Sequence, residues 1–310
     1  MEIKYIYIKY LCVALLFCHF SLKVQAQQGG ATLYEPGWQV SVAPYYSIKQ
    51  MHWSVAGNTS GMNPNILSEL KWKSVQSIGG GIEIKKRIYN NLWGQVAFYK
   101  GATIAGNATD ADYRSDYRQD RTYFDRFDAS RGFEWLFTPG VAYLLKINRY
   151  NSLNIYAGYY LNKEKYYLLP QGGNTRSDLK TTYQPNWKAW SVGFTYQLNI
   201  NPNWNISPSF TYRQLHYDAR ANWNLIEDFQ HPVSFEHYAK GFEIQPQLDL
   251  SYFIKNGTAL TFRVQYAHAA TGHGSEALYL VNGETRATRL NGVTRDRFGL
   301  SLLTGIYGKK

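Results

Sequence analysis

The chain has 310 residues and a formal net charge of +11, and aromatic residues make up 16% of it. Its mean hydropathy is −0.41. No run after residue 26 approaches 18 consecutive apolar residues, which excludes membrane-spanning helices but does not exclude a barrel of alternating strands. Both cysteines, Cys12 and Cys18, precede residue 26, so the remainder is not a disulfide scaffold.

The first 26 residues have the layout of a secretory signal peptide. Lys4 and Lys9 precede an apolar run at 11–20, and the small residue Ala26 marks a cleavage point. We therefore expect residues 1–26 to be removed and residues 27–310 to form one exported domain. Removal leaves 30 basic and 21 acidic residues. On an exported protein, this excess favours anionic lipid head groups over nucleic acid as the partner.

Segments with alternating polar and apolar residues recur along the rest of the chain. They cover 37–53, 66–88, 92–106, 132–147, 152–169, 183–200, 203–224, 234–254, 258–270 and 290–307. Short turns rich in Asn, Gly or Pro alternate with long polar stretches between them. This pattern predicts an all-β fold, a transmembrane antiparallel β-barrel of about ten strands with long extracellular loops, short periplasmic turns and periplasmic termini. A soluble β-sandwich is the alternative, but it rarely needs such long strands.

The segment 209–224 shows the alternation most clearly. From residue 215 onward the odd positions are mostly apolar and end at Trp223, whereas the even positions are polar. We expect positions 217, 219, 221 and 223 to face lipid, with Trp223 in the interfacial aromatic belt. Positions 216, 218, 220, 222 and 224 would then line a wet lumen.

The stretch "NATDADY" places Asp110 and Asp112 one residue apart at the end of a predicted strand. Side chains at i and i+2 of a strand lie on the same face, so the two carboxylates should repel each other. We expect a raised pKa, or a bound cation or water, at one of them. Further aspartates follow, but arginines are interleaved with them, so we predict a solvated loop and no metal site.

The run "ILSELKWKS…GGGIEIKKRIYNNLWGQVAFYKGATIAGNATDADY" resembles the omptins, the ten-stranded outer-membrane proteases of Gram-negative bacteria. The shared features are a strand with "LKWK", a short turn, and a long strand that ends in Asp-x-Asp-aromatic, here Asp110, Asp112 and Tyr113. "YAGYYLNKEKYY", "YQPNWKAWSVGF" and "LDLSYFIKNGTALTFRVQYAH" follow in the same order. The resemblance implies localisation in the outer membrane, lipopolysaccharide as a lipid activator and no other cofactor.

In omptins the Asp pair faces an Asp-x-His dyad, and a water held between them attacks the peptide carbonyl. The resemblance carries Asp110 and Asp112 over to the first half, but it places Asn222 and Asn224 at the dyad. Neither amide can act as a general base. Arg220 lies where omptins commonly have an acidic residue that favours basic substrates, so the substrate-binding position is altered as well.

The lipid site that the resemblance implies is only half present. Lys163 matches a basic position that omptins use for lipopolysaccharide, but Asn186 replaces an expected arginine. A replacement for the missing catalytic base would have to come from His231 or His237, which lie near the outer loops. His216 and Asp218 have the dyad spacing in reversed order and lie further down the strand.

These observations favour a catalytically impaired omptin-like barrel that acts as a surface binding protein. We expect a monomer, folded by the barrel-assembly machinery, that contacts outer-membrane lipopolysaccharide and a peptide or surface-protein ligand but no nucleic acid. The alternative is an active omptin-type endopeptidase at the cell surface. A narrow channel is a third hypothesis, because ten strands leave no room for a general porin.

Overall fold

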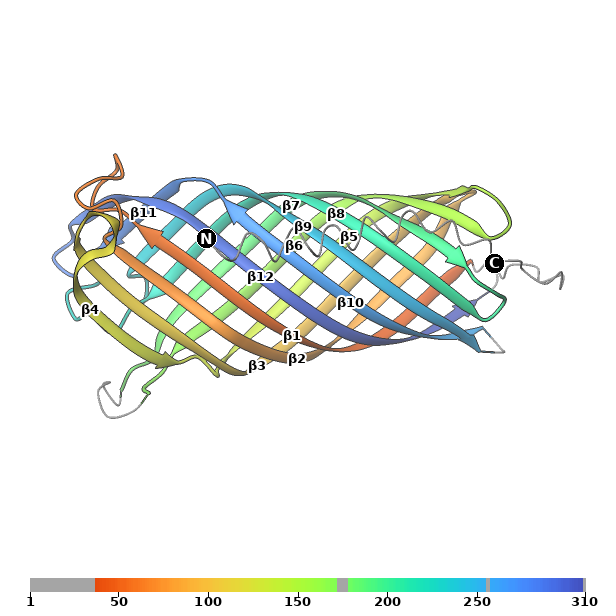
Figure 1. Ribbon diagram of the computed structural model, residues 1–310, viewed down its shortest axis with the longest axis horizontal. Helices are drawn as coiled ribbons and strands as arrows, with labels where there is room; N and C mark the ends of the chain where they lie inside the picture. Colours follow the sequence, from red (N-terminus) through yellow and green to blue (C-terminus); the bar gives the residue numbers. More distant parts are fainter. Residues whose placement is uncertain (1–36, 172–177, 255–256, 309–310) are drawn as a thin grey trace. The chain divides into compact units, whose positions relative to one another are not determined.

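The computed structural model describes residues 37–171, 178–254 and 257–308, which form an antiparallel sheet closed into a barrel (Figure 1). The strands are β1 (Trp38–Val55), β2 (Ser68–Tyr89), β3 (Leu92–Ser115), β4 (Gln119–Asp128), β5 (Gly132–Lys146), β6 (Asn151–Leu168), β7 (Thr181–Asn199), β8 (Trp204–Asn222), β9 (Phe235–Ile254), β10 (Thr258–Thr271), β11 (Gly274–Tyr279) and β12 (Thr285–Gly308). A single 3-10 turn, η1 (Asp116–Arg118), joins β3 to β4. No helix in the described ranges is long and apolar enough to cross a membrane.

Ten strands form the ring, in the order β1-β2-β3-β5-β6-β7-β8-β9-β10-β12, and pairing of β12 with β1 closes it. The short strand β4 pairs with the far part of β3, beyond the part that pairs with β5. In the same way, β11 continues beyond β10 and pairs with β9 and β12. The predicted ten-stranded antiparallel barrel is therefore confirmed. β3 is longer than expected and carries Asp110 and Asp112 inside the strand.

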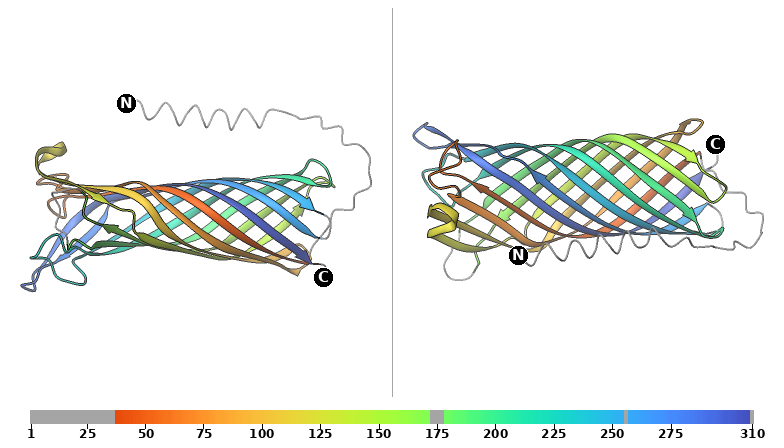
Figure 2. Two further views of the ribbon diagram at one scale, coloured as in Figure 1. Left: turned by 90° about the horizontal axis from the view of Figure 1, so that it is seen from below. Right: turned by 45° about the horizontal axis from the view of Figure 1, so that its top comes forward.

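The two ends of the barrel differ, as Figures 1 and 2 show. The loop end carries the long connections together with β4 and β11, and the turn end carries the short turns. The β2–β3 hairpin turn is one of these short turns, and Asn90 takes a left-handed conformation there (φ 40°). Trp38 pairs with Gly308 at the turn end, so the first and last strands begin and end together. The predicted signal peptide, residues 1–26, lies outside the described residues and stays a prediction.

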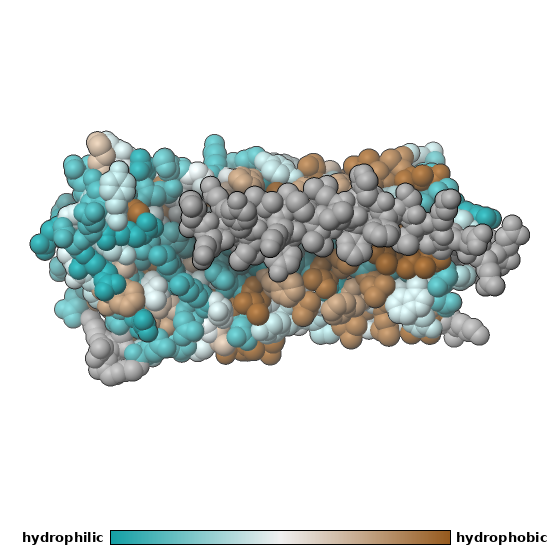
Figure 3. Space-filling view, viewed as in Figure 1, coloured by the Kyte–Doolittle hydropathy of each residue, from teal (hydrophilic) through white to brown (hydrophobic). Residues whose placement is uncertain are grey.

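The outward face of the barrel changes from apolar to polar along each strand. Toward the turn end it carries exposed apolar side chains, such as Ile48 of β1, Trp190 of β7 and Phe298 of β12. Two residues further toward the loop end, Gln50 and Lys188 are the outward residues of β1 and β7. Figure 3 shows the apolar surface gathered over the turn-end half and the polar surface over the loop-end half. An apolar band of this kind is the lipid-facing belt of a membrane barrel.

The inward face changes in the opposite sense. Polar and charged side chains line the lumen in the turn-end half, and apolar ones fill it in the loop-end half. In β8 the change falls between Arg213, which is buried in the lumen, and Leu215, which belongs to the apolar core. The loop-end half therefore has the polar exterior and apolar interior of a water-soluble protein, and it projects beyond the lipid.

The predicted assignment of faces in β8 is wrong. Tyr217, Ala219 and Ala221 point into the barrel and are nearly inaccessible, whereas His216 and Arg220 point outward and are exposed. The alternation itself is present as expected. The apolar positions face inward instead of outward because this part of β8 lies in water, where apolar side chains turn toward the interior. Trp223 is likewise buried in the core and does not lie in a lipid-facing belt.

Candidate functional site

Aromatic side chains fill the lumen of the loop-end half. We call this cluster the aromatic plug; it consists of Trp53, Trp72, Tyr183, Trp187, Tyr217, Trp223 and Phe235, each at most 4% exposed. The rings of Trp53 and Phe235 lie 5.9 Å apart, those of Trp72 and Tyr183 5.3 Å, and those of Trp187 and Tyr217 4.5 Å. These residues come from β1, β2, β7, β8 and β9 and from the loop after β8, so the plug joins opposite walls of the barrel. Such contacts stabilise the half that projects into water.

His237, a candidate replacement base, is embedded in this plug. Its Nε2 lies 2.7 Å from an oxygen of Glu276, and its Nδ1 lies 2.7 Å from the hydroxyl of Tyr183. The hydroxyls of Tyr183 and Tyr217 are 2.5 Å apart. His237 therefore has an acidic partner and a hydroxyl partner, but it is completely buried and cannot reach a substrate in this conformation. The pair with Glu276 was missed because 39 residues separate the two.

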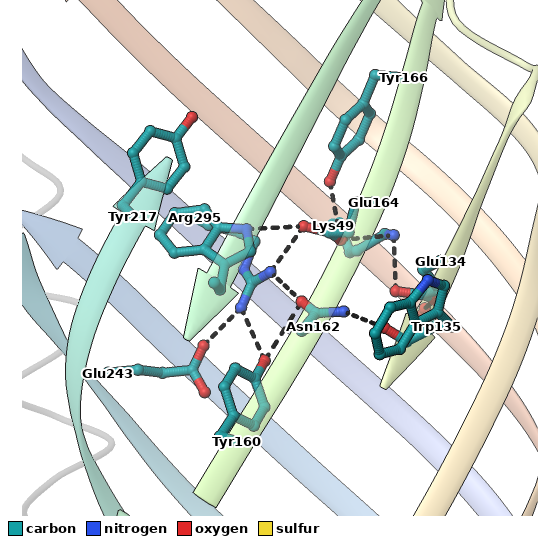
Figure 4. A network of polar contacts seen from close by, with 12 residues as sticks. Lys49, Glu134, Trp135, Tyr160, Asn162, Glu164, Tyr166, Tyr217, Glu243 and Arg295 are labelled. Atoms are coloured by element: carbon teal, nitrogen blue, oxygen red, sulfur yellow. Dashed lines mark hydrogen bonds and ion pairs between the residues drawn. The ribbon is translucent and has the colours of Figure 1, made fainter. Parts of the chain in front are cut away.

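A buried network of ion pairs lies next to the plug, toward the turn end (Figure 4). We call it the ion layer; it contains Lys49, Glu134, Glu164, Arg213, Glu243 and Arg295. Lys49 bridges Glu134 at 2.9 Å and Glu164 at 3.0 Å. Arg295 bridges Glu164 at 2.7 Å and Glu243 at 2.6 Å. Each ion here is paired, which offsets the cost of removing charges from water.

The Asp pair lies on β3 in the loop-end half. Asp110 is 4% exposed and pairs across the sheet with Leu70 of β2 and Asp125 of β4. Burial raises the pKa of Asp110 well above its ordinary value, and the charges of Asp112 and Asp125 raise it further. Burial also raises the pKa of Asp112, although a hydrogen bond with Ser68 lowers it in part. The direction agrees with the expectation, but burial is the larger cause, and the repulsion between the two carboxylates that the sequence predicted is the smaller one.

No imidazole in the described part of the chain forms a hydrogen bond with either aspartate, and one oxygen of Asp110 has no partner there. Nor do three or more His, Cys, Asp or Glu side chains of these residues gather as metal ligands.

Asn222 and Asn224 hold loops in place. Nδ1 of His231 lies 2.7 Å from the side-chain oxygen of Asn222, to which it can donate. The side-chain oxygen of Asn224 accepts hydrogen bonds from the Lys180 amide at 3.1 Å and from the Thr181 hydroxyl at 2.9 Å. His231 is thus the imidazole that the structure brings to the predicted dyad positions.

Lys163 and Arg220 lie on the outer surface, in a shared groove of about 480 Å³. The outer groove is lined by Phe133, Trp135, Lys163, Glu164, Gln184, Asn186, Lys188, Asp218 and Arg220. Arg220, expected inside the barrel, faces outward and pairs with Glu236 at 2.7 Å. Lys163, Asn186 and Arg220 are far apart in the sequence, and the pairing of β6 with β7 and of β7 with β8 brings them together.

The outer groove lies where the outward face changes from apolar to polar. The ammonium of Lys163 lies 6.0 Å from the ring centre of Trp135. Lys188 forms an ion pair with Asp218 at 2.7 Å, and Asn186 donates a hydrogen bond to the same carboxylate at 2.7 Å. Lys163 is therefore the groove cation that no carboxylate of the described residues pairs with.

Comparison with known proteins gives a family match and several solved outer-membrane barrels with a similar fold. A family model described as "Pom: Protochlamydia outer membrane protein" matches residues 45–305. The outer membrane protease OmpT from Escherichia coli is 13% identical, with 90% of this chain and 99% of that chain covered and a TM-score of 0.65. No curated protein matches the chain.

Other solved barrels align less well. The translocator domain of the autotransporter NalP from Neisseria meningitidis is 10% identical over 95% of this chain and 96% of that chain, with a TM-score of 0.35. The toluene transporter TodX from Pseudomonas putida is 7% identical over 89% of this chain and 91% of that chain, with a TM-score of 0.32. Neither supports an argument, and the likeness to OmpT shows a shared outer-membrane barrel fold rather than omptin descent.

Proposed function

This chain belongs to the Protochlamydia outer membrane protein family and lies in the outer membrane, and from that premise we propose that it is a non-proteolytic surface barrel that binds anionic lipid. The lipid phosphates, those of lipopolysaccharide included, would bind in the outer groove at Lys163. A further peptide or surface-protein ligand would bind at the loop end.

The observation that carries the non-proteolytic part is the aromatic plug. Tyr183, Trp223 and Phe235 occupy the inside of the loop-end half, where an omptin-like protein would need space for a peptide. Asp110 is buried, and Asn222 and Asn224 are engaged with loop groups. Without a base to take a proton from water, the rate of hydrolysis should fall by roughly 100- to 10,000-fold.

The lipid part of the proposal is supported by the chemistry of the outer groove. Lys163 and Lys188 supply positive charge, and Phe133 and Trp135 supply apolar surface on the side of the lipid belt. A phosphate could therefore bind the cations while an acyl chain lies against the rings.

The second candidate is an active surface endopeptidase. It is favoured by the raised pKa of Asp110, because strongly perturbed carboxylates concentrate at active sites. It is also favoured by the position of His231 beside Asn222. Activity would need the loop after β8 to bring His231 to the Asp pair.

The two candidates are separated by one set of measurements on the refolded protein. We expect no cleavage of fluorogenic peptides with Arg-Arg or Arg-Lys bonds in the presence of lipopolysaccharide. We also expect the double variant Lys163→Gln, Lys188→Gln to retain at least ten-fold less lipopolysaccharide than the parent protein. The control is Lys240→Gln, which lies on the outward face but outside the groove and should retain as much lipopolysaccharide as the parent. Cleavage that Asp110→Ala or His231→Ala abolishes would overturn the non-proteolytic proposal.

A further inference from the structure

The lumen of the turn-end half is polar and accessible to solvent. Tyr45, Gln247 and Gln265 point inward there, yet none of them is fully buried, unlike the residues of the aromatic plug. Tyr45 reaches across the lumen and donates a hydrogen bond to Glu134 at 3.0 Å. A side chain at Gly101 would collide with the Tyr45 hydroxyl, so the glycine leaves room for it. Water can thus enter from the turn end as far as the ion layer.

Arg297 lies where this wet space meets the ion layer. It pairs across the sheet with Lys49 of β1 and is 6% exposed. Lys49, Arg213 and Arg295 all form ion pairs. Arg297 forms neither an ion pair nor a hydrogen bond with any residue that the structure describes, and its Nε is buried without a partner. The charges of Glu243 and Glu134 act on this guanidinium without contacting it, so its hydrogen-bonding groups are available to water or to a bound anion.

The charges around Arg297 do not balance. With Arg297 included, the ion layer has four cations, Lys49, Arg213, Arg295 and Arg297, and three carboxylates, Glu134, Glu164 and Glu243. Further toward the turn end, Arg263 lies between Glu83 and Asp249, and Lys85 is a second cation beside Glu83, so the charges there balance. Arg263 pairs with Ser301, four residues beyond Arg297, which is about 13 Å along the strand. The positive excess is therefore confined to the ion layer.

Small residues surround Arg297 on the side of the wet space. Gly299 is the next inward position of β12, Ala267 pairs with Arg297 on β10, and Ser47 is the next inward position of β1. An added Cβ at Gly299 would first meet the end of the Gln265 side chain, at 2.9 Å. The Gln265 side chain therefore lies over Gly299, and it would move aside when a small group binds next to the guanidinium.

We propose that Arg297 forms an anion-binding site at the closed end of the turn-end lumen, for a small molecule with one carboxylate or phosphate group. The planar guanidinium donates two parallel hydrogen bonds to either group, and the bound anion neutralises the excess charge. The turn end of an outer-membrane barrel faces the periplasm, so the ligand is a periplasmic solute.

The test is titration of the refolded chain in detergent with sodium acetate and with sodium phosphate, followed by calorimetry. We expect saturable binding with one site, and at least a ten-fold loss of affinity in Arg297→Gln. Arg297→Lys keeps the charge without the planar fork and should lose less. Lys240→Gln removes an outward charge and should bind like the parent. The different migration of heated and unheated barrels verifies that each variant is folded.

A second variant tests the same site without removing the cation. Gly299→Val adds bulk beside Arg297 where the Gln265 side chain already lies, so that side chain can no longer move aside, and binding should weaken at least ten-fold while the charge stays. Binding of acetate alone would identify a carboxylate ligand, and binding of phosphate alone a phosphate ligand. The proposal is overturned if neither anion binds the parent, or if a folded Arg297→Gln or Gly299→Val binds both as the parent does.

Discussion

The hydroxyl of Tyr183 lies 2.7 Å from Nδ1 of His237, and Glu276 lies at the same distance from the other ring nitrogen. His237→Ala would leave the buried Glu276 and Tyr183 without this partner. We expect it to lower the free energy of unfolding by about 3 kcal/mol. Urea unfolding followed by tryptophan fluorescence measures this, with the exposed His216→Ala as control. Equal stability of the two variants would mean that the His237 contacts contribute nothing.

The orientation of β8 can be tested with single cysteines, since both natural cysteines precede residue 27. A membrane-impermeant maleimide should label cysteines at 216 and 220 on intact cells, because these positions face water outside the lipid. Cysteines at Ala219 and Ala221 should stay unlabelled until the protein is denatured. Labelling of both pairs at one rate would contradict the packed interior.

Loss of Arg295 should destabilise the whole barrel. Arg295→Gln removes one of the two cations that contact each of Glu164 and Glu243, and breaking buried ion pairs in this way typically costs about 3–5 kcal/mol. The same unfolding assay should show little change for Arg220→Gln, whose ion pair with Glu236 is exposed to water. A variant at Arg295 with parental stability would show that the layer relaxes around the loss.

The raised pKa of Asp110 predicts a defined pH dependence. A carboxyl whose pKa is higher in the folded than in the unfolded chain lowers stability as pH rises from the unfolded value, 3.8, through the folded one. Asp110→Asn should therefore raise the midpoint of thermal unfolding at pH 8 and have no effect below pH 3.8. Asp228→Asn, in an exposed loop, is the control. A gain of equal size at both pH values would exclude titration of Asp110 as its cause.

The lumen should not conduct ions. The aromatic plug and the ion layer fill it in succession, so the protein inserted into a planar bilayer should show no steady conductance. Replacing Trp53 and Trp72 with alanine removes two large plug residues and should reduce stability before it opens a path. Steady conductance of the unaltered protein would support the channel hypothesis instead.

Much of the architecture follows from the sequence because strands repeat every two residues. The ten-strand count, the connections of unequal length and the placement of Asp110 and Asp112 on one strand could all be predicted from that period. Alternation alone does not show whether the apolar or the polar positions face inward. Apolar side chains face outward in the part of a strand that lies in lipid, and they face inward in the part that lies in water. One signal was available: at 19 residues, β8 is nearly twice the roughly 9–11 residues that span a membrane, so half of it had to lie outside.

The functional contacts were harder to predict than the fold. His237 finds Glu276, and Lys163 finds Trp135, only after strand register is set. The sequence does not distinguish the unpaired Arg297 from the paired Arg295. The two lie two residues apart on the same inward face of β12 and differ only in their partners. Which charges pair over long range depends on how the barrel closes, and this cannot be predicted from the local sequence.

The reversal of the two faces also constrains how the chain reaches its final position. Insertion begins from the periplasm, so the loop-end half of every strand must traverse the hydrocarbon before the apolar half can settle in it. Lys188 and Lys240 lie on the outward side of that leading half, and a lysine at the bilayer centre costs about 2.5–3.5 kcal/mol. Separate hairpins would meet this barrier one after another. This barrier is avoided if the strands cross together as a curled sheet while an assembly partner screens the polar outer surface of the leading half.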